Sequence, residues 1–156
     1  MLPFCDEATK QANTVNKRDL HATWDLQRFW FTDANGVEVD PLGTDPAGNL
    51  ILGADGQYAF NMMRRDRSPY ASGDLLGGTA EEKGEAADGY VSFGGTWSFD
   101  GEAILFDIVY SLFPNWVGGQ QKRLASFDGD ELLLQTTGSI LLAGKTHRGA
   151  ALWRRK

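Results

Sequence analysis

The chain has 156 residues, of which 42% are hydrophobic and 23% charged, as is typical of one globular domain. Its 15 Lys and Arg residues against 21 Asp and Glu residues give a net charge of −6, which argues against a nucleic-acid or membrane-surface partner. The single cysteine, Cys5, excludes an internal disulfide and a cysteine-rich metal cluster. We find neither a secretory signal nor a transmembrane run, and therefore expect a cytoplasmic protein.

The N-terminal segment is polar and rich in residues that favour helices. Residues 6–20 contain Ala, Lys and Gln, and they predict an N-terminal helix. We therefore divide the chain into a helical extension, residues 1–20, and a second domain over residues 21–156.

Four short turn signals follow along the chain. They are Asn35-Gly36, Asp55-Gly56, Asp100-Gly101 and Asp128-Gly129, and each lies between runs rich in β-forming residues. Such pairs tolerate positive φ and suit the tight turns of hairpins, so they predict an antiparallel meander. The expected strands cover residues 23–32, 49–52, 57–64, 90–99, 103–112, 121–127, 131–136 and 148–154.

A second helix is expected between the third and fourth strands. Thr79 followed by Glu82 forms a capping-box pattern, which predicts a short helix over residues 79–87. The long loop before it, after residue 63, is typical of a functional cover. The expected fold is all-β, an eight-stranded antiparallel up-and-down barrel with an N-terminal helix and this short helix. Eight strands can enclose one small ligand.

Alternation along the strands predicts which side chains face the interior. The third strand places Tyr58, Phe60 and Arg64 on one face, and the fourth strand places Phe93 and Trp97 together. In the first strand Trp24, Leu26, Arg28 and Trp30 share a face, but neither face is polar and the orientation stays open. Trp24 is expected to fill the closed end. The last strand groups His147 with Gly149, Ala151 and Trp153.

Asp107 lies within the apolar run of the fifth strand. If it faces inward, it must be paired, hydrated or protonated, because a bare buried carboxylate is costly. If it faces outward, Ile104, Phe106 and Tyr110 fill the core and Asp107 is solvated. The strand alone leaves both orientations open.

Several longer motifs carry a resemblance to a known family. They are ATWDL at 22–26, PLGTDPAGNLILGADGQY at 41–58, MRRDRSPYASGDLLGGT at 63–79, SLFPNWVG at 111–118 and the Gln121/Arg123 pair. With these motifs the chain resembles the bacterial and fungal lipocalin-like domain proteins, which are small, unsecreted, eight-stranded barrels.

The resemblance implies a calyx that binds a small hydrophobic molecule. It also implies a setting in polyketide or terpenoid metabolism, where related barrels act as isomerases or cyclases. The family often carries histidines near positions 106 and 107, where this chain has Phe106 and Asp107. Chemistry assigned to such histidines therefore does not carry over.

Three residues are candidates for catalysis. Asp107, if inside, would be a general acid or base, because a carboxyl group in an apolar cavity exchanges protons near neutrality. Tyr58 or Arg123 would stabilise a developing oxyanion. Arg123 could equally form a closed structural salt bridge with Asp107.

Other residues are candidates for ligand binding, each with a structural alternative. Arg64 could clamp an anionic group at the barrel mouth, or anchor the loop through Asp66 or Asp74. Trp116, in FPNWVGG, could contact ligand at the rim or cover one barrel end. The remaining candidates are Arg28, Phe60, Phe93, Trp97, His147 and Trp153.

Two functions and one structural alternative follow from this pattern. The first is a cofactor-free enzyme that isomerises, cyclises or dehydrates an apolar metabolite, with no metal. The second is a carrier or sensor without chemistry. The structural alternative is a barrel whose interior is filled. The expected partner is a small hydrophobic molecule, and the protein is expected to be a monomer or a homodimer.

Overall fold

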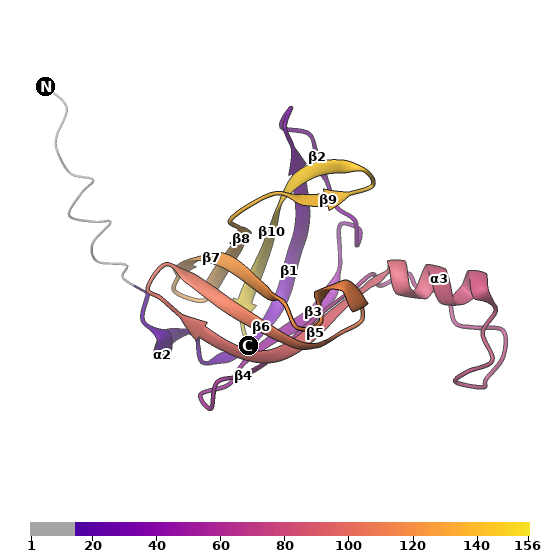
Figure 1. The fold of residues 1–156 in the computed structure, drawn as a ribbon, viewed down its shortest axis with the longest axis horizontal. Coiled ribbons are helices and arrows are strands. Elements are labelled where there is room, and N and C mark those ends of the chain that lie inside the picture. Colours follow the sequence, from indigo (N-terminus) through magenta and orange to yellow (C-terminus); the bar gives the residue numbers. More distant parts are fainter. Residues whose placement is uncertain (1–14) are drawn as a thin grey trace, which may run out of the picture.

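The computed structural model describes residues 15–156, and these form a closed barrel of eight antiparallel strands (Figure 1). Each strand pairs with the next along the barrel, and β1 pairs with β10 from Trp24 opposite Arg155 to Asp33 opposite His147. The barrel strands are β1 (Ala22–Asp33), β3 (Ala47–Leu52), β4 (Gln57–Met63), β5 (Tyr90–Phe99), β6 (Ala103–Ser111), β7 (Gln120–Asp128), β8 (Glu131–Thr136) and β10 (Lys145–Arg155).

The four predicted turns are confirmed as hairpin turns. Gly36, Gly56, Gly101 and Gly129 all adopt positive φ, between 59° and 101°, which a residue without a Cβ adopts at little cost. Three of the turns join barrel strands. The turn at Gly36 instead joins β1 to the short strand β2 (Glu38–Val39), which the sequence did not indicate.

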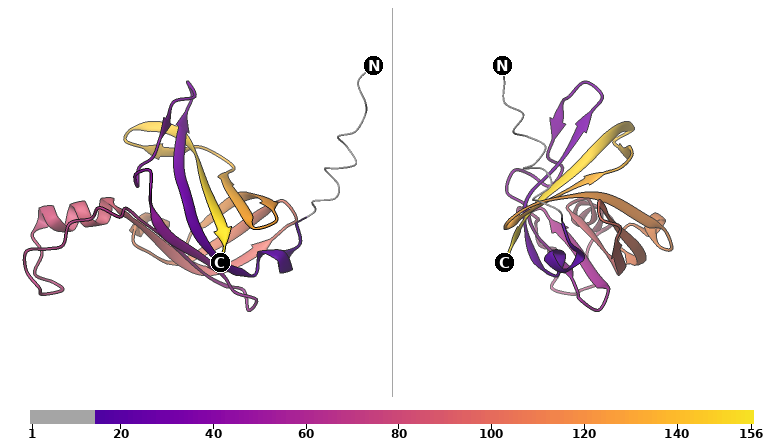
Figure 2. Two further views of the ribbon diagram at one scale, coloured as in Figure 1. Left: turned by 180° about the vertical axis from the view of Figure 1, so that it is seen from behind. Right: turned by 90° about the vertical axis from the view of Figure 1, so that its left-hand side faces the viewer.

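A second short strand, β9 (Ile140–Leu142), pairs with the start of β10 and extends the barrel wall at the same end as β2. β10 consequently begins at Lys145, three residues before the predicted start. This end of the barrel is open, and its rim comprises the β1–β3, β4–β5, β6–β7 and β8–β10 connections (Figure 2).

The two helices differ from each other in how far they match the prediction. In the described part of the predicted N-terminal helix only α2 (Lys17–Leu20) is helical, while residues 6–14 lie outside the described residues. The second helix, α3 (Ala80–Asp88), is confirmed with Thr79 as its N-cap. Within residues 15–156, no helix has the length and apolar character needed to span a membrane.

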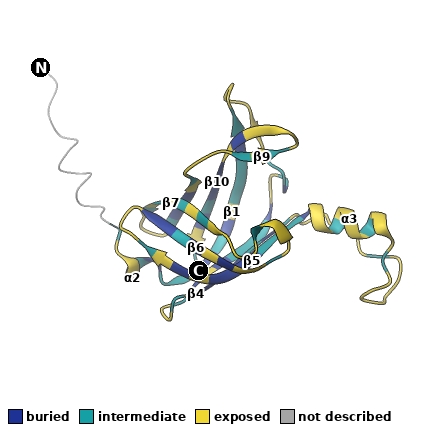
Figure 3. Ribbon diagram, in the orientation of Figure 1, coloured by how far each residue is buried: buried dark blue, intermediate teal, exposed yellow. Residues whose placement is uncertain are grey.

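The β4–β5 loop and α3 do not cover the barrel mouth. They project together from the open end, away from the strands (Figures 1 and 2). No residue of α3 is buried, as Figure 3 shows. The loop was expected to be a functional cover, but it projects away from the mouth, and this connection reaches the pocket of the barrel through the C-terminal end of α3, where Ala87 and Asp88 line it.

The other end of the barrel is closed by α2 and a large aromatic residue. Trp24 is fully buried, and its Nε1 donates a hydrogen bond to the Leu20 carbonyl at 3.0 Å. Leu20 is also fully buried, which anchors α2 against the barrel. The prediction that Trp24 fills the closed end is therefore confirmed.

Two β-bulges change which side chains enter the barrel. Leu26 pairs with Trp153 and Arg28 with Leu152, so Gln27 is an extra residue in β1. On β6, Gly94 pairs with Tyr110 and Gly95 with Ile108, so Val109 is the extra residue. A bulge shifts every later side chain to the opposite face. The simple alternation used above therefore fails beyond Gln27 and beyond Val109.

Candidate functional site

A pocket of about 440 Å³ occupies the open half of the barrel. That volume lies in the range of small-molecule sites. Its wall is mostly aromatic and aliphatic, and residues from seven barrel strands contribute, including Phe29, Phe31, Phe60, Met62, Val91, Phe93, Ser111, Arg123, Leu134, Thr136, Gly149 and Ala151.

The inner half of the barrel, in contrast, is packed with side chains. The Phe60 and Phe93 rings stack with centroids 4.4 Å apart, and Trp153 meets Phe60 edge-on at 5.2 Å. Phe106, fully buried, also packs against Phe60. Phe60 and Phe93 form the floor of the pocket, and Phe106 and Trp153 lie beneath it. The barrel is thus filled with side chains toward its closed end and hollow toward its open end.

One side of the mouth is closed by the short 3-10 helix η1 (Pro114–Trp116). Its Trp116 ring meets Phe93 edge-on at 5.3 Å and Phe113 at 5.5 Å. Trp116 therefore lies between the pocket and the rim, where it can contact both a ligand and the solvent.

Arg123 is the one arginine or lysine that lines this pocket. It lies on β7, between Ile104 of β6 and Thr136 of β8, on the inward-facing side of the strand. Its Nη1 donates to the Gln121 Oε1 at 2.9 Å and to the Lys122 carbonyl at 3.1 Å. Among residues 15–156, no carboxylate lies within ion-pair distance of the guanidinium. Burial lowers the pKa of Arg123 from 12.5 to about 10, so the group is cationic at neutral pH.

A family model described as a lipocalin-like domain matches residues 21–156. The chain belongs to the lipocalin-like domain family. The match covers all eight strands of the barrel and the pocket within it.

One known protein and one crystal structure are similar to this lipocalin-like chain. The chain is 26% identical, over 102 residues, to the 4'-hydroxy-3'-methoxypropiophenone carrier protein ppsC of Aspergillus oryzae. That match covers 60% of this chain and 92% of the relative. A crystal structure of a lipocalin-like protein from Bacteroides uniformis aligns with a TM-score of 0.47 at 15% identity, covering 88% of this chain and 99% of that one.

The lipocalin-like barrel brings four of the predicted site residues together in the pocket. Phe60 and Phe93 lie at its floor, Trp116 at its mouth, and Arg123 in its wall. The predicted ligand contacts of these four residues stay predictions.

Asp107, the predicted acid or base, lies on the outer face of the barrel. Its carboxylate is exposed and accepts hydrogen bonds from Gln120 Nε2 at 2.8 Å and Thr96 Oγ1 at 3.5 Å. The inward orientation is therefore wrong, and so is the predicted contact between Asp107 and Arg123. The side chains on either side of Asp107 along β6, Phe106 and Ile108, point inward and are buried.

Tyr58 faces inward, as predicted, but its hydroxyl is not free to act on a ligand. It donates to the backbone carbonyl of Asp107 at 3.1 Å, and burial raises its pKa above the ordinary range. The residue lies among Phe93 and Phe106, and it does not line the pocket. The predicted oxyanion role of Tyr58 is not supported by this position.

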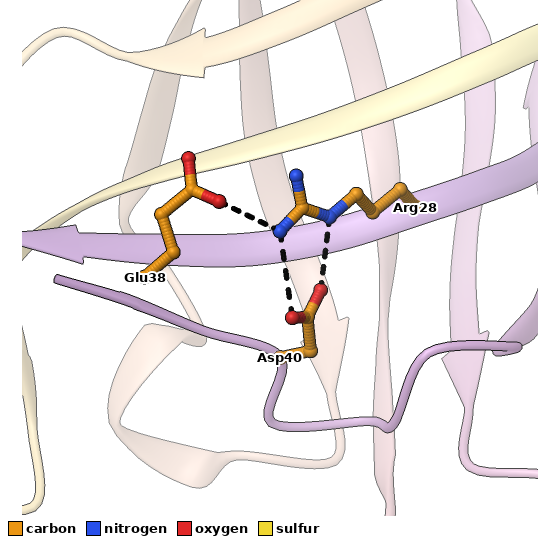
Figure 4. Close-up of polar contacts among 3 residues, drawn as sticks. All are labelled: Arg28, Glu38 and Asp40. Atoms are coloured by element: carbon orange, nitrogen blue, oxygen red, sulfur yellow. Dashed lines mark hydrogen bonds and ion pairs between the residues drawn. The ribbon is translucent and has the colours of Figure 1, made fainter.

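Arg28 was expected inside the barrel, and the bulge at Gln27 places it outside instead. Figure 4 shows its guanidinium between two carboxylates: Nη2 lies 2.8 Å from Glu38 Oε2, and Nε lies 3.0 Å from Asp40 Oδ1. These hydrogen bonds, that to Asp40 first, raise the pKa of Arg28. The cluster ties β1 to the β1–β3 connection, and Arg28 is not a ligand-binding residue in this geometry.

Arg64 anchors the β4–β5 loop, which was the structural alternative to the predicted anion clamp. It follows the end of β4, where its Nη2 donates to the Pro41 carbonyl at 2.8 Å and its Nε lies 3.7 Å from Asp66 Oδ1. The side chain is about half exposed and does not line the pocket. These contacts match the structural alternative: Arg64 anchors two rim connections to each other, and its position does not support the predicted anion clamp.

Three further aromatic candidates are buried but outside the pocket. Trp97 lies toward the closed end, where its Nε1 donates to the Gly53 carbonyl at 2.9 Å. Trp153 lies under the floor formed by Phe60. His147 faces inward beside Phe31, and its Nδ1 lies 3.0 Å from the Lys145 carbonyl. All three support the pocket instead of lining it.

The sequence-based prediction missed the residues of the pocket that come from β1 and β8. Phe29 and Phe31 line it because the bulge at Gln27 turns them inward. The sequence gives a partial warning here, because RFWF carries aromatic side chains on both faces of the strand. Alternation therefore does not show which face of this strand is inward. Leu134 and Thr136 could have been found from the alternation of β8.

Proposed function

We propose that this lipocalin-like protein binds a small, largely apolar organic molecule in the open half of the barrel and carries it unchanged. The single observation that carries the proposal is the pocket of about 440 Å³ between an aromatic floor and an open mouth. An apolar wall with few polar groups is what a ligand of this kind requires.

The positions of the polar side chains favour a carrier over an acid–base enzyme. A proton-transfer mechanism needs a group that can take up and release a proton within reach of the ligand. Asp107 lies on the outer face, and the Tyr58 hydroxyl is held by a backbone carbonyl. The charged residues that line the pocket are Asp88, which is exposed at the end of α3, and Arg123. Arg123 is a fixed cation, which can bind a ligand oxygen but does not exchange protons readily near neutral pH.

The similarity to the propiophenone carrier protein supports the same class of ligand. A substituted aryl ketone has a flat apolar ring and polar oxygens at its ends. Such a molecule suits a pocket with aromatic rings at its floor and one guanidinium in its wall. We therefore place the ligand of this protein among small aromatic natural products.

The test uses 4'-hydroxy-3'-methoxypropiophenone as the probe. Trp116 lies at the pocket, so ligand binding should quench tryptophan fluorescence with a saturable curve and one site per chain. Chromatography after prolonged incubation should recover the compound unchanged. Conversion to a product would overturn the carrier function. Failure of this compound and of a neutral polarity-sensitive probe to bind would overturn the ligand-binding function.

A further inference from the structure

We infer that the pocket selects ligands bearing one anionic oxygen group, that is, small aromatic organic acids or phenolates, and that Arg123 is the residue that selects them. This inference rests on the proposed function, because it concerns the ligand of the same pocket. It adds the charge of the ligand and the protein group that binds that charge.

The first support is the set of donors that Arg123 leaves free. Of its three nitrogens, only Nη1 has acceptors among the described residues, namely Gln121 Oε1 and the Lys122 carbonyl. Nε and Nη2 have no protein acceptor there. A guanidinium presents its N–H groups in a planar fork, and two free nitrogens match the two oxygens of a carboxylate or the single oxygen of a phenolate.

The second support is the missing counter-charge. The ion pairs among residues 15–156 involve other cations, for example Arg28, Lys122 and Arg154, and all of these are substantially exposed. Arg123 lines the apolar pocket without one: the other charged residue of the lining, Asp88 at the end of α3, is exposed and forms no ion pair with it among the described residues. A partly buried charge without a partner loses part of its hydration, and a ligand anion would offset that cost.

The third support is the nature of the partner that Arg123 does have. The Gln121 amide orients the guanidinium and leaves its charge uncancelled. A structural arginine would gain more from a carboxylate at that position. A neutral orienting group therefore fits a cation that is reserved for a ligand. Desolvation lowers the pKa of Arg123 only to about 10, so the positive charge is retained at neutral pH.

The experiment compares two fluorescent probes with the same ring skeleton. 8-Anilinonaphthalene-1-sulfonate carries a sulfonate, and N-phenyl-1-naphthylamine lacks it. Arg123→Met should weaken binding of the sulfonate probe by about ten-fold or more, since a hydrogen bond to a charged group is lost. Binding of the neutral probe should stay within about two-fold of the parent chain. Arg28→Met, on the outer face, is the matched control and should change neither affinity.

These outcomes separate the inference from the proposed function. If the parent chain binds neither probe, the ligand-binding function fails. If the neutral probe binds and Arg123→Met leaves the sulfonate probe unaffected, the anion selectivity fails while ligand binding stands. Arg123→Lys keeps the charge without the planar fork, and it should give an intermediate affinity for the sulfonate probe.

A second measurement needs no variant and so does not depend on folding of Arg123→Met. The parent chain is saturated with 4-nitrophenol, and the visible absorption of the bound phenolate is followed against pH. A cation beside the hydroxyl lowers the pKa of the bound phenol, whereas an apolar pocket alone raises it. We expect the pKa of the bound phenol to lie below that of the free compound. A pKa above that of the free compound would overturn the inference.

Discussion

The guanidinium of Arg155 lies over the indole ring of Trp24, with Cζ 4.5 Å from the ring centroid. The same guanidinium donates to the Asp19 carbonyl of α2. Since Trp24 also binds the Leu20 carbonyl, the last strand, the first strand and α2 are joined at one place. This contact closes the end of the barrel opposite the pocket.

Arg155→Ala should therefore destabilise the protein without changing its pocket. Loss of a partly buried cation–π contact and of a charged hydrogen bond should lower the free energy of unfolding by about 2 kcal/mol. Thermal unfolding should show a midpoint lower by about 5 °C. The neighbouring Arg154→Ala is the control, because Arg154 forms only an exposed ion pair with Glu131. Equal losses in the two variants would contradict a special role for Arg155.

Asp107→Asn should leave ligand binding unchanged, because the carboxylate lies on the outer face and interacts with Gln120 and Thr96. We expect the affinity for the neutral naphthylamine probe to stay within about two-fold, as for most surface substitutions. Fluorescence titration checks this directly. A loss of binding in this variant would contradict the outward position of the Asp107 carboxylate.

Ala151→Leu should fill part of the pocket. Ala151 is buried and lines the cavity, and a longer side chain there would occupy the space of the ligand. The empty volume should accommodate the extra atoms with little loss of stability, while affinity for the naphthylamine probe falls by about ten-fold or more. Ser126→Leu adds the same side chain on the exposed face of β7 and serves as the control. Unchanged affinity in Ala151→Leu would place the bound probe outside the barrel.

Glu82 should hold the β4–β5 loop to α3 in a pH-dependent way. Its carboxylate accepts hydrogen bonds from the backbone N–H of Thr79 at 2.9 Å and of Ala71 at 2.8 Å, which lower the pKa of Glu82. A carboxyl group with a lowered pKa in the folded state stabilises that state above its unfolded pKa. The contribution is lost as the pH falls through the lowered value.

The prediction is that the Ala71 amide exchanges hydrogen faster in Glu82→Gln than in the parent chain at neutral pH. In the parent chain the same acceleration, corrected for intrinsic exchange, should appear only under acidic conditions. Glu81→Gln, one residue earlier and also in the first turn of α3, is the control. Equal protection of Ala71 in both variants would show that the loop is held by other contacts.

Much of the fold follows from signals that act over a few residues. The Asp-Gly and Asn-Gly pairs mark turns because glycine adopts positive φ there, and the Thr79–Glu82 box marks a helix start because each side chain caps the other's backbone. The sequence named Arg123 as a candidate that could point inward, and it does so on β7, whose pairings contain no bulge.

The site was harder to predict where alternation breaks down. Arg28 was a candidate for ligand binding but lies outside, and Phe31, which was not a candidate, lines the pocket, because Gln27 has no partner on β10. A bulge is a property of two paired strands, so the sequence of one strand does not locate it. For the second bulge, at Val109 of β6, the facing pair Gly94 and Gly95 on β5 is a partial sequence signal. A Cβ at Gly94 would collide with the Tyr110 ring, and a Cβ at Gly95 would lie 2.1 Å from the Asp107 carbonyl oxygen.

The amino-acid sequence by itself determined the number of barrel strands and the order in which they pair, because these depend on local turns and on the period of the strands. Its longer motifs carried the resemblance to the family. Only the tertiary structure decided that Asp107 lies outside, that Arg123 lies inside without a carboxylate, and that the barrel is packed below and hollow above. Each of those depends on cross-strand register and on the sizes of side chains that meet across the closed barrel, which come from distant parts of the chain.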